Sequence, residues 1–271
     1  MSDLYDVKIG IASVKQNLYS VKMVTYKAAM VTKSNIGRTR VRRAATKPAP
    51  ARPTRKRSPA RSAPGESTPY HHGALRDGLL GAAERVLERD GLAGLTLRAV
   101  AREAGVSHAA PTHHFGDLTG LVSELAAIGF RQFNAAMAAA GALGTLPIEK
   151  AMARAKAYVA YAQAHPGMYG LMFRTERLDM KRPALCEAAN ASFAGLAGAI
   201  GASRQEVISE ESLSLDQAAD IARAWSLVHG FTMLLLDDRL SDILHRLPPG
   251  TDAGMLLDAM LKRAIAQLPP A

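Results

Sequence analysis

The sequence predicts an all-α protein, with a small three-helix unit followed by a larger helical body. Its 271 residues are 48% hydrophobic, enough to bury a sizeable core and one smaller unit. From about residue 73 onward apolar residues recur at the three- and four-residue spacing of amphipathic helices. No alternation typical of a β-sheet and no internal repeat is present, so an all-α fold of about nine helices is expected.

Helices are expected, in chain order, at residues 73–89, 97–104, 108–114, 118–140, 148–164, 167–174, 182–201, 215–236 and 252–267. The breaks between the later helices coincide with helix-ending residues: Gly141, Gly144 and Pro147, then His165-Pro166-Gly167, Arg182-Pro183 and Pro248-Pro249-Gly250.

The first expected helix carries an apolar face and stops at Asp90-Gly91. Its apolar residues are Leu75, Leu79, Ala83, Val86 and Leu87.

The second and third helices form the most informative stretch, TLRAVAREAGVSHAAPTHHF. Thr96 is placed to cap the second helix, and Gly105 supplies the left-handed turn that ends it. Val106 fills the corner, and Ser107 is expected to cap a helix that runs to Phe115. Two short helices joined by a tight turn with Gly are typical of the helix-turn-helix that reads the DNA major groove. An ordinary helical hairpin is the alternative.

The run around this stretch resembles the N-terminal domain of the TetR family of transcriptional regulators. The matching motifs are Ala82-Ala83, Asp90-Gly91, Thr96-Leu97-Arg98, Val100-Ala101, Ala104-Gly105-Val106-Ser107, His114-Phe115 and Leu121, with Asp117 placed to cap the next helix. The resemblance implies a DNA-binding transcriptional regulator, a ligand-responsive repressor that acts as a homodimer on a pseudo-palindromic operator, from which ligand binding in the C-terminal domain releases it. It also implies a three-helix DNA-binding domain followed by a helical ligand-binding and dimerisation domain.

Two positions depart from the family pattern, which has Tyr at Thr112 and Lys at Leu118. Both residues commonly contact backbone phosphates in relatives, and such contacts position a protein on the duplex. We therefore expect weaker binding with a flatter salt dependence. Pro111, near the start of its helix, costs at most one intrahelical hydrogen bond.

Exposed residues of the reading helix are expected to contact base edges, and Arg98 to contact a guanine or a phosphate. Helix caps can also accept phosphates at helix N-termini. The expected DNA-binding residues are Thr96, Arg98, Ser107, His108, Ala109, Ala110, Thr112 and His113. Packing roles are expected for Val100, Ala104, Val106 and Phe115, and His114 is expected in the core rather than on DNA.

The body is expected to hold a small apolar or amphipathic ligand between its helices. The candidate pocket residues cluster in two segments that could face one another: Tyr158, Tyr161, Met168, Tyr169, Met172, Phe173, Trp225, His229 and Met233. Each one alone would more often be a core residue. The patterns HPGMY, LMF and Trp225 with His229-Gly230 look like a TetR group whose C-terminal domain has a Trp and His-Gly signature.

The last two long helices, near 215–236 and 252–267, carry wide apolar stripes. They include Leu227, Phe231, Leu234 and Leu235 on one helix and Met255, Leu256, Ala259, Met260 and Ile265 on the other. Such stripes are either internal core or a two-fold interface. The family resemblance favours a homodimer through these helices, which form a four-helix bundle.

Charge divides the chain unevenly. Residues 1–69 hold 15 Lys/Arg and three Asp/Glu, a net charge of +12, and the total of +10 leaves −2 for the rest. The basic, Pro-rich tail is expected to be disordered, either as an electrostatic arm on DNA or as a solvated tail. Translation is expected to begin at Met30 or later. The expected domains are therefore 1–69, 70–117 and 118–271.

Other classes of protein are disfavoured. No nucleophile motif or phosphate-binding loop argues for an enzyme, since GLAGAIG at 195–201 has the wrong spacing. No cofactor or metal is expected: five histidines (His71, His72, His108, His113 and His114) lie in one unit, but His113 and His114 point to different faces. The single Cys186, read as a small buried residue, fits a reducing cytoplasm, and no apolar stretch is long enough for a membrane helix. An architectural DNA binder that needs no ligand stays an alternative.

Overall fold

The computed structural model describes residues 72–209 and 211–266, all of which lie in helices or connecting loops. The elements are α3 (His72–Gly94), α4 (Leu97–Glu103), α5 (Ala109–Phe115), α6 (Leu118–Ala142), α7 (Pro147–Ala164), α8 (Pro166–Met172), the 3₁₀-helix η1 (Thr175–Arg177), α9 (Pro183–Arg204), α10 (Leu215–Leu236), α11 (Ser241–Leu244) and α12 (Ala253–Ala266). The predicted all-α class is confirmed. The predicted tail over 1–69 and the predicted start at Met30 lie outside the described residues.

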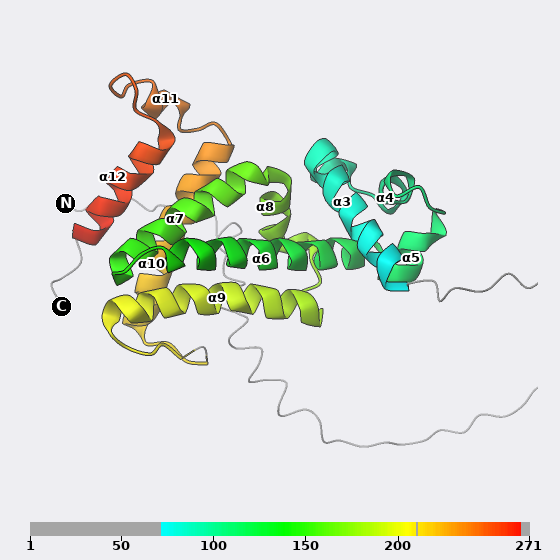
Figure 1. Cartoon of the computed structure of the whole chain (residues 1–271), viewed down its shortest axis with the longest axis horizontal. Helices are drawn as coiled ribbons and strands as arrows, with labels where there is room; N and C mark the ends of the chain where they lie inside the picture. Colours follow the sequence, from blue (N-terminus) through cyan, green and yellow to red (C-terminus); the bar gives the residue numbers. More distant parts are fainter. Residues whose placement is uncertain (1–71, 210, 267–271) are drawn as a thin grey trace, which may run out of the picture.

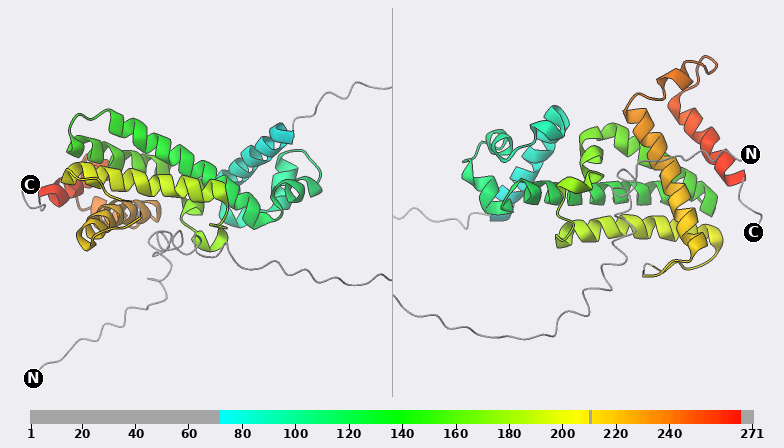
Figure 2. Two further views of the ribbon diagram at one scale, coloured as in Figure 1. Left: turned by 90° about the horizontal axis from the view of Figure 1, so that it is seen from below. Right: turned by 180° about the vertical axis from the view of Figure 1, so that it is seen from behind.

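The long helix α6 organises the molecule. Its 25 residues span about 37 Å, and it runs from the small unit α3–α5 through the body (Figure 1). Helices α7 and α9 lie along α6, and α10 crosses the body on the face seen from behind (Figure 2). Helices α11 and α12 lie at the end of the body farthest from α3–α5 (Figures 1 and 2). The small unit α3–α5 and the helices α11 and α12 thus lie at opposite ends of the described part of the chain.

One apolar core runs from the small unit into the body. Leu79, Val86 and Val100 are fully buried in it, together with Leu121 and Leu125 on α6. A second, smaller cluster packs α12 on α7 and on the end of α10. It contains the buried residues Ala155, Val159, Phe231, Leu240, Leu257 and Leu261. The small unit is therefore packed on the body through shared side chains, and is not tethered by a linker alone.

Local differences from the predicted elements have simple causes. α3 continues to Gly94, but Gly91 has φ 66° and ψ −175°, so the predicted stop at Asp90-Gly91 appears as a kink. The short η1 and α11 were not predicted, because three or four residues show no periodicity.

None of the helices in the described part of the chain has the length and apolar content needed to cross a bilayer.

Candidate DNA-binding and ligand sites

The turn between α4 and α5 has helix-turn-helix geometry. Thr96 Oγ1 accepts a hydrogen bond from Ala99 N at 3.1 Å, which confirms the predicted cap of α4. Gly105 has φ 67°, a left-handed conformation that a Cβ disfavours. Val106 N then donates to Ala101 O at 3.0 Å and closes the turn. The predicted corner is confirmed.

The start of α5 differs from the prediction. The N-cap position is His108, and no side chain caps the helix. Ser107 contributes only its backbone, whose carbonyl accepts from Ala110 N at 3.0 Å. The predicted side-chain cap by Ser107 is therefore wrong. His108 has helical φ and ψ of −61° and −19°, so the turn enters the helix directly, without the extended residue that a side-chain cap requires.

The seven residues of α5 divide into a buried and an outward face. Pro111 and Phe115 are buried against the unit's core. The outward side carries predicted DNA-binding residues from α5 and the turn before it: Ser107, His108, Ala109, Thr112 and His113 are exposed, and Ala110 is half-buried. Thr96, the N-cap residue of α4, and Arg98 on α4 are also exposed. His114 is half-buried, with its ring 6.2 Å from that of Phe115. The DNA contacts themselves stay predictions.

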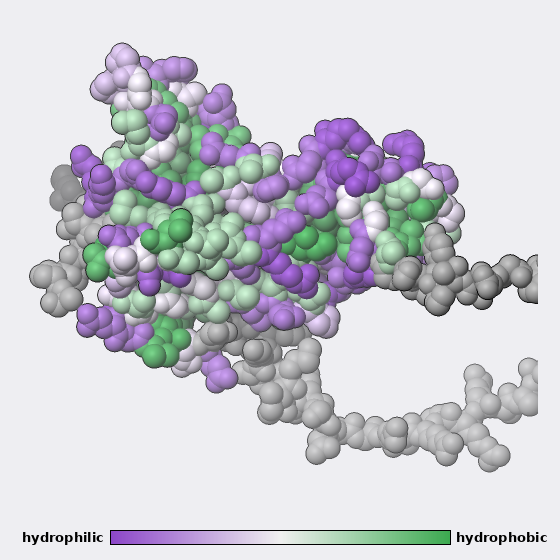
Figure 3. Space-filling model, in the orientation of Figure 1, coloured by the Kyte–Doolittle hydropathy of each residue, from purple (hydrophilic) through white to green (hydrophobic). Residues whose placement is uncertain are grey.

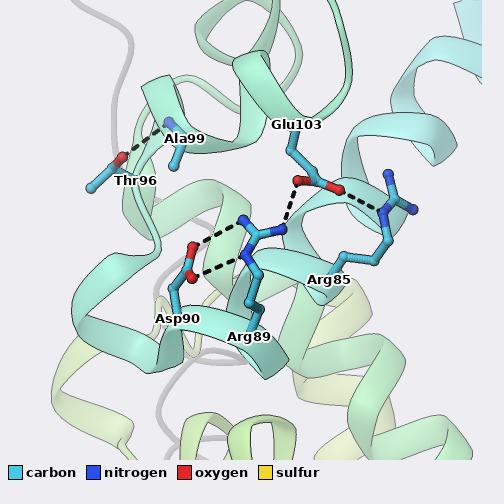
Figure 4. Close-up of polar contacts among 6 residues, drawn as sticks. All are labelled: Arg85, Arg89, Asp90, Thr96, Ala99 and Glu103. Atoms are coloured by element: carbon cyan, nitrogen blue, oxygen red, sulfur yellow. Dashed lines mark hydrogen bonds and ion pairs between the residues drawn. The ribbon is translucent and has the colours of Figure 1, made fainter.

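An ion-pair network that the sequence did not reveal holds α4 against α3 (Figure 4). Glu103 accepts from Arg85 Nε at 2.8 Å and from Arg89 Nη1 at 2.9 Å. Arg89 also pairs with Asp90 at 3.0 Å, just before the kink at Gly91. The hydrogen bond from Arg85, followed by that from Arg89, lowers the pKa of Glu103. Glu103 is half-buried, but Arg85, Arg89 and Asp90 are exposed, so the network fixes geometry more than it stabilises the fold.

The junction between α5 and α6 is also held by polar groups. Asp117 Oδ1 accepts from Gly120 N at 2.7 Å, which confirms the predicted cap of α6. Leu118, where the family has Lys, is half-buried and packs against the core. It lines a hollow of about 250 Å³ whose other lining residues are Leu92, Leu95, Thr119, Val122, Glu176 and Arg177. The missing lysine is thus replaced by an inward-facing packing residue.

In the body, three predicted pocket residues form a polar cluster in which Tyr169 is buried and Tyr158 and His229 are half-buried. The hydroxyls of Tyr158 and Tyr169 lie 2.9 Å and 2.8 Å from Nδ1 of His229, and 3.2 Å from each other. Burial raises the pKa of Tyr158 to about 12 and also raises that of Tyr169, and it lowers the pKa of His229. At neutral pH the cluster is therefore uncharged, and its groups offer hydrogen bonds only.

Of the six other predicted pocket residues, some lie next to the cluster of Tyr158, Tyr169 and His229 and others do not. The rings of Phe173 and Trp225 lie 4.8 Å and 5.8 Å from that of His229. Tyr161 instead directs its hydroxyl to Gly129 O of α6, at 3.1 Å. The remaining three lie elsewhere: Met168 and Met172 are buried in the main core, and Met233 is 39% exposed. Sequence reasoning missed Phe133, whose ring is 4.9 Å from that of Tyr158.

The apolar stripes of α10 and α12 are divided between core and surface. Leu227, Phe231 and Leu235 pack in the second cluster, whereas Leu234 and Met255 are 44% and 54% exposed. Apolar side chains show on the surface where α11 and the end of α10 lie (Figure 3). The exposed side of α10 carries the small residues Ala219, Ala222 and Ser226. A hollow of about 550 Å³ between α7, α10 and α12 adjoins Met255 and Leu235.

A helix-turn-helix with an exposed second helix, joined to a helical body, is the architecture of a DNA-binding transcriptional regulator. Residues 79–125 match the family model of bacterial regulatory proteins of the tetR family, and residues 151–264 match that of the tetracyclin repressor-like C-terminal domain. The chain belongs to the TetR family of transcriptional regulators.

Solved structures share this fold. A protein of unknown function from Rhodococcus sp. RHA1 is 32% identical, with a TM-score of 0.59 over 73% of this chain and 96% of that one. The putative regulatory protein SCO4313 is 21% identical (TM-score 0.54, 71% and 96% covered), and the TetR family regulator PfmR from Thermus thermophilus is 16% identical (TM-score 0.50, 71% and 99% covered). The last two show likeness of fold alone. No curated protein matches the sequence.

Proposed function

We propose that this TetR-family regulator is a ligand-responsive repressor that binds a pseudo-palindromic operator as a homodimer. The observation that carries the proposal is the outward face of α5 and its N-cap position, where Thr112, His113 and His108 are exposed next to the helix-turn-helix corner. A short helix presented in this way fits the major groove, where imidazole and hydroxyl groups meet base edges.

Each candidate residue is assigned a contact by its chemistry. His108 and His113 donate to or accept from base edges, and Ala109 and Ala110 allow close approach or contact a thymine methyl. Arg98 contacts guanine or phosphate, and the exposed hydroxyls of Thr96, Ser107 and Thr112 serve as phosphate donors. Since Leu118 faces the core, the phosphate contact of the family's lysine is absent, and the salt dependence of binding should be shallower by about 0.9.

The homodimer is proposed to form through α10 and α12. The exposed small residues of α10 let a second helix approach closely, and exposed Leu234 and Met255 add apolar area. A Cβ built on Gly230 meets no atom within 4 Å, so this part of α10 faces open space in the single chain. Pairing through this face would fix the distance between two reading helices, and hence the spacing of two half-sites.

The ligand is proposed to bind in the body at the Tyr158, Tyr169 and His229 cluster. Because these groups are neutral and surrounded by aromatic rings, they suit a small apolar or amphipathic molecule that carries a hydrogen-bonding group. A ligand that prefers the arrangement with misplaced reading helices weakens DNA binding by its coupling free energy, about 1–3 kcal/mol. In this proposal, residues 70–117 bind DNA, and residues 118–271 bind the ligand and form the homodimer.

DNA reading is tested by fluorescence anisotropy on the DNA upstream of the protein's own gene. His113→Ala should weaken selective binding about tenfold, since one base contact contributes about 1–3 kcal/mol. His245→Ala is the control, because His245 is an exposed histidine beside α11, at the opposite end of the fold. Equal Kd values for both variants and the unmodified protein would refute reading by α5.

Dimerisation is tested by sedimentation of two glycine variants. Gly230→Lys and Gly198→Lys both add a side chain where a Cβ meets no atom within 4 Å, the first on α10 and the second on α9. Only the α10 variant should dissociate into single chains and lose operator binding. A Gly230→Lys variant that stays dimeric would exclude this face of α10 as the interface.

A further inference from the structure

Arg182, at the N-cap position of α9, reaches out of the body to the end of the reading helix. Its Nη2 donates to the carbonyl oxygen of Phe115 at 3.3 Å, across 67 positions of sequence. Phe115 is the last residue of α5, so this carbonyl is one of the helix's terminal acceptors. A guanidinium placed there also interacts favourably with the negative end of the helix dipole.

Two carboxylates lie near the Arg182 guanidinium, at ion-pair distances that are too long for hydrogen bonds. Glu124 of α6 lies 3.6 Å from Arg182 Nη1, and Asp179 lies 3.8 Å from Nε. Glu124 also pairs at 2.8 Å with Arg76 of α3, whose guanidinium lies 5.5 Å from the centre of the Phe115 ring. Two arginines from different parts of the chain thus meet one carboxylate beside the end of α5.

The loop that carries Arg182 is itself fastened to α6. The buried hydroxyl of Ser123 accepts from Asp179 N at 2.8 Å and donates to Thr119 O at 2.7 Å. Gly120 leaves the path of Arg182 open: a Cβ at this position would lie 2.5 Å from Nη2. The backbone carbonyl of Phe115, the nearby carboxylates and the space left at Gly120 therefore together favour this position of the Arg182 side chain.

We propose that Arg182 is a positioning residue for DNA recognition, which fastens the carboxyl end of the reading helix to the body without contacting DNA. The inference rests on the proposed reading of DNA by α5. A seven-residue helix does not hold its own conformation in water and depends on tertiary contacts for its orientation. The hydrogen bond from Arg182 is such a tertiary contact, and it lies at the end of α5 that leads into α6.

The experiment compares Arg182→Gln and Arg182→Lys with Arg177→Gln. Arg177 is an exposed arginine at the end of η1, five residues before Arg182, so its variant loses the same charge. Each full-length variant is measured for its Kd on upstream DNA and on unrelated DNA across salt, for amide hydrogen exchange at 109–117, and for its melting temperature.

Arg182→Gln should bind upstream DNA about tenfold more weakly, the loss that follows from one hydrogen bond to a charged group. Its salt slope should stay that of the unmodified protein, and exchange at 109–117 should be faster. Arg182→Lys keeps the charge but lacks the guanidinium fork, so its Kd and its exchange rate should lie between those of Arg182→Gln and the unmodified protein. Arg177→Gln should match the unmodified protein in exchange and in Kd.

Three outcomes would overturn the inference. A slope reduced by about 0.9 in Arg182→Gln would make Arg182 a phosphate ligand. An equal loss of affinity in Arg177→Gln would make the effect one of net charge. Unchanged exchange at 109–117 would show that Arg182 does not hold α5. If the unmodified protein fails to select upstream DNA, the proposed function fails, whereas the exchange comparison still decides whether Arg182 fastens the helix.

Discussion

Replacing Gly120 by Ala should destabilise the protein even though alanine favours helices. Gly120 is the third residue of α6, directly after the turn from the reading helix. A Cβ at this position would lie 2.0 Å from the carbonyl oxygen of Phe115 and 2.5 Å from Arg182 Nη2. The first of these atoms belongs to the backbone, so it cannot move aside by a simple change of rotamer.

The size of the effect follows from these distances. Carbon and carbonyl oxygen meet at about 3.3 Å, so the Phe115 carbonyl must retreat by about 1.3 Å. Overpacking of this kind costs about 1–3 kcal/mol, and displacement of the Arg182 hydrogen bond adds about 1.5 kcal/mol. The better helix propensity of alanine returns about 1 kcal/mol. The net loss should be roughly 1.5–3.5 kcal/mol.

Urea unfolding followed by circular dichroism measures this loss against a matched control. Gly78→Ala lies inside α3, where a Cβ meets no atom within 4 Å, and it should stabilise the protein by about 0.5–1 kcal/mol. Both variants should have the m-value of the parent. If Gly120→Ala shifts the midpoint upward as Gly78→Ala does, the close approach of Phe115 and Arg182 to α6 is wrong.

Three further results are expected. Thr96→Ala should lower the free energy of unfolding by about 1 kcal/mol because Ala99 N loses its cap, whereas Thr96→Ser should not; equal losses in urea titrations would contradict the cap. Burial lowers the pKa of His229, so the unfolded chain binds the proton more readily, and the free energy of unfolding should fall as the pH drops below 6.5. His229→Gln should flatten this fall between pH 8 and 5, and an unchanged slope would count against the burial of the imidazole. Leu121→Ala should cost about 2–5 kcal/mol, since the side chain is fully buried, and Leu215→Ala, 85% exposed, less than about 0.5 kcal/mol. Similar midpoints for these two variants would refute the assigned core.

Local signals in the sequence predicted the helix-turn-helix well. The cap at Thr96, the left-handed turn at Gly105 and the cap at Asp117 each depend on residues within four positions, and the structure has all three. Ser107 shows the limit of such signals, since its residue type suits a cap but the helical backbone of His108 leaves the side chain no capping role.

Contacts between distant parts of the chain were not predictable from one sequence. The sequence predicts Arg182 only as part of a helix break with Pro183, because nothing near it in sequence points to Phe115, 67 residues away. The ion pairs of Glu103 with Arg85 and Arg89 also depend on how α3 and α4 cross.

The candidate ligand site was predicted as two segments that face each other, and Tyr158, Tyr169 and His229 do so. The prediction included Met168 and Met172 because they share these segments with the tyrosines. Both methionines instead lie on the side of α8 that packs into the main core.

The shortness of α5 limits how much sequence information one copy of the protein can use. Seven residues extend about 10 Å, the length of roughly three base pairs. Any given three-base-pair word recurs by chance about every 64 base pairs, whereas a genome offers about 10⁶–10⁹ competing sites. Two copies at fixed spacing would read about six base pairs, and the chance that a random site matches both half-sites would be the square of the chance for one. The remaining discrimination then has to come from residues outside α5, for which Arg98 is the proposed candidate, and from how readily the DNA between the half-sites bends.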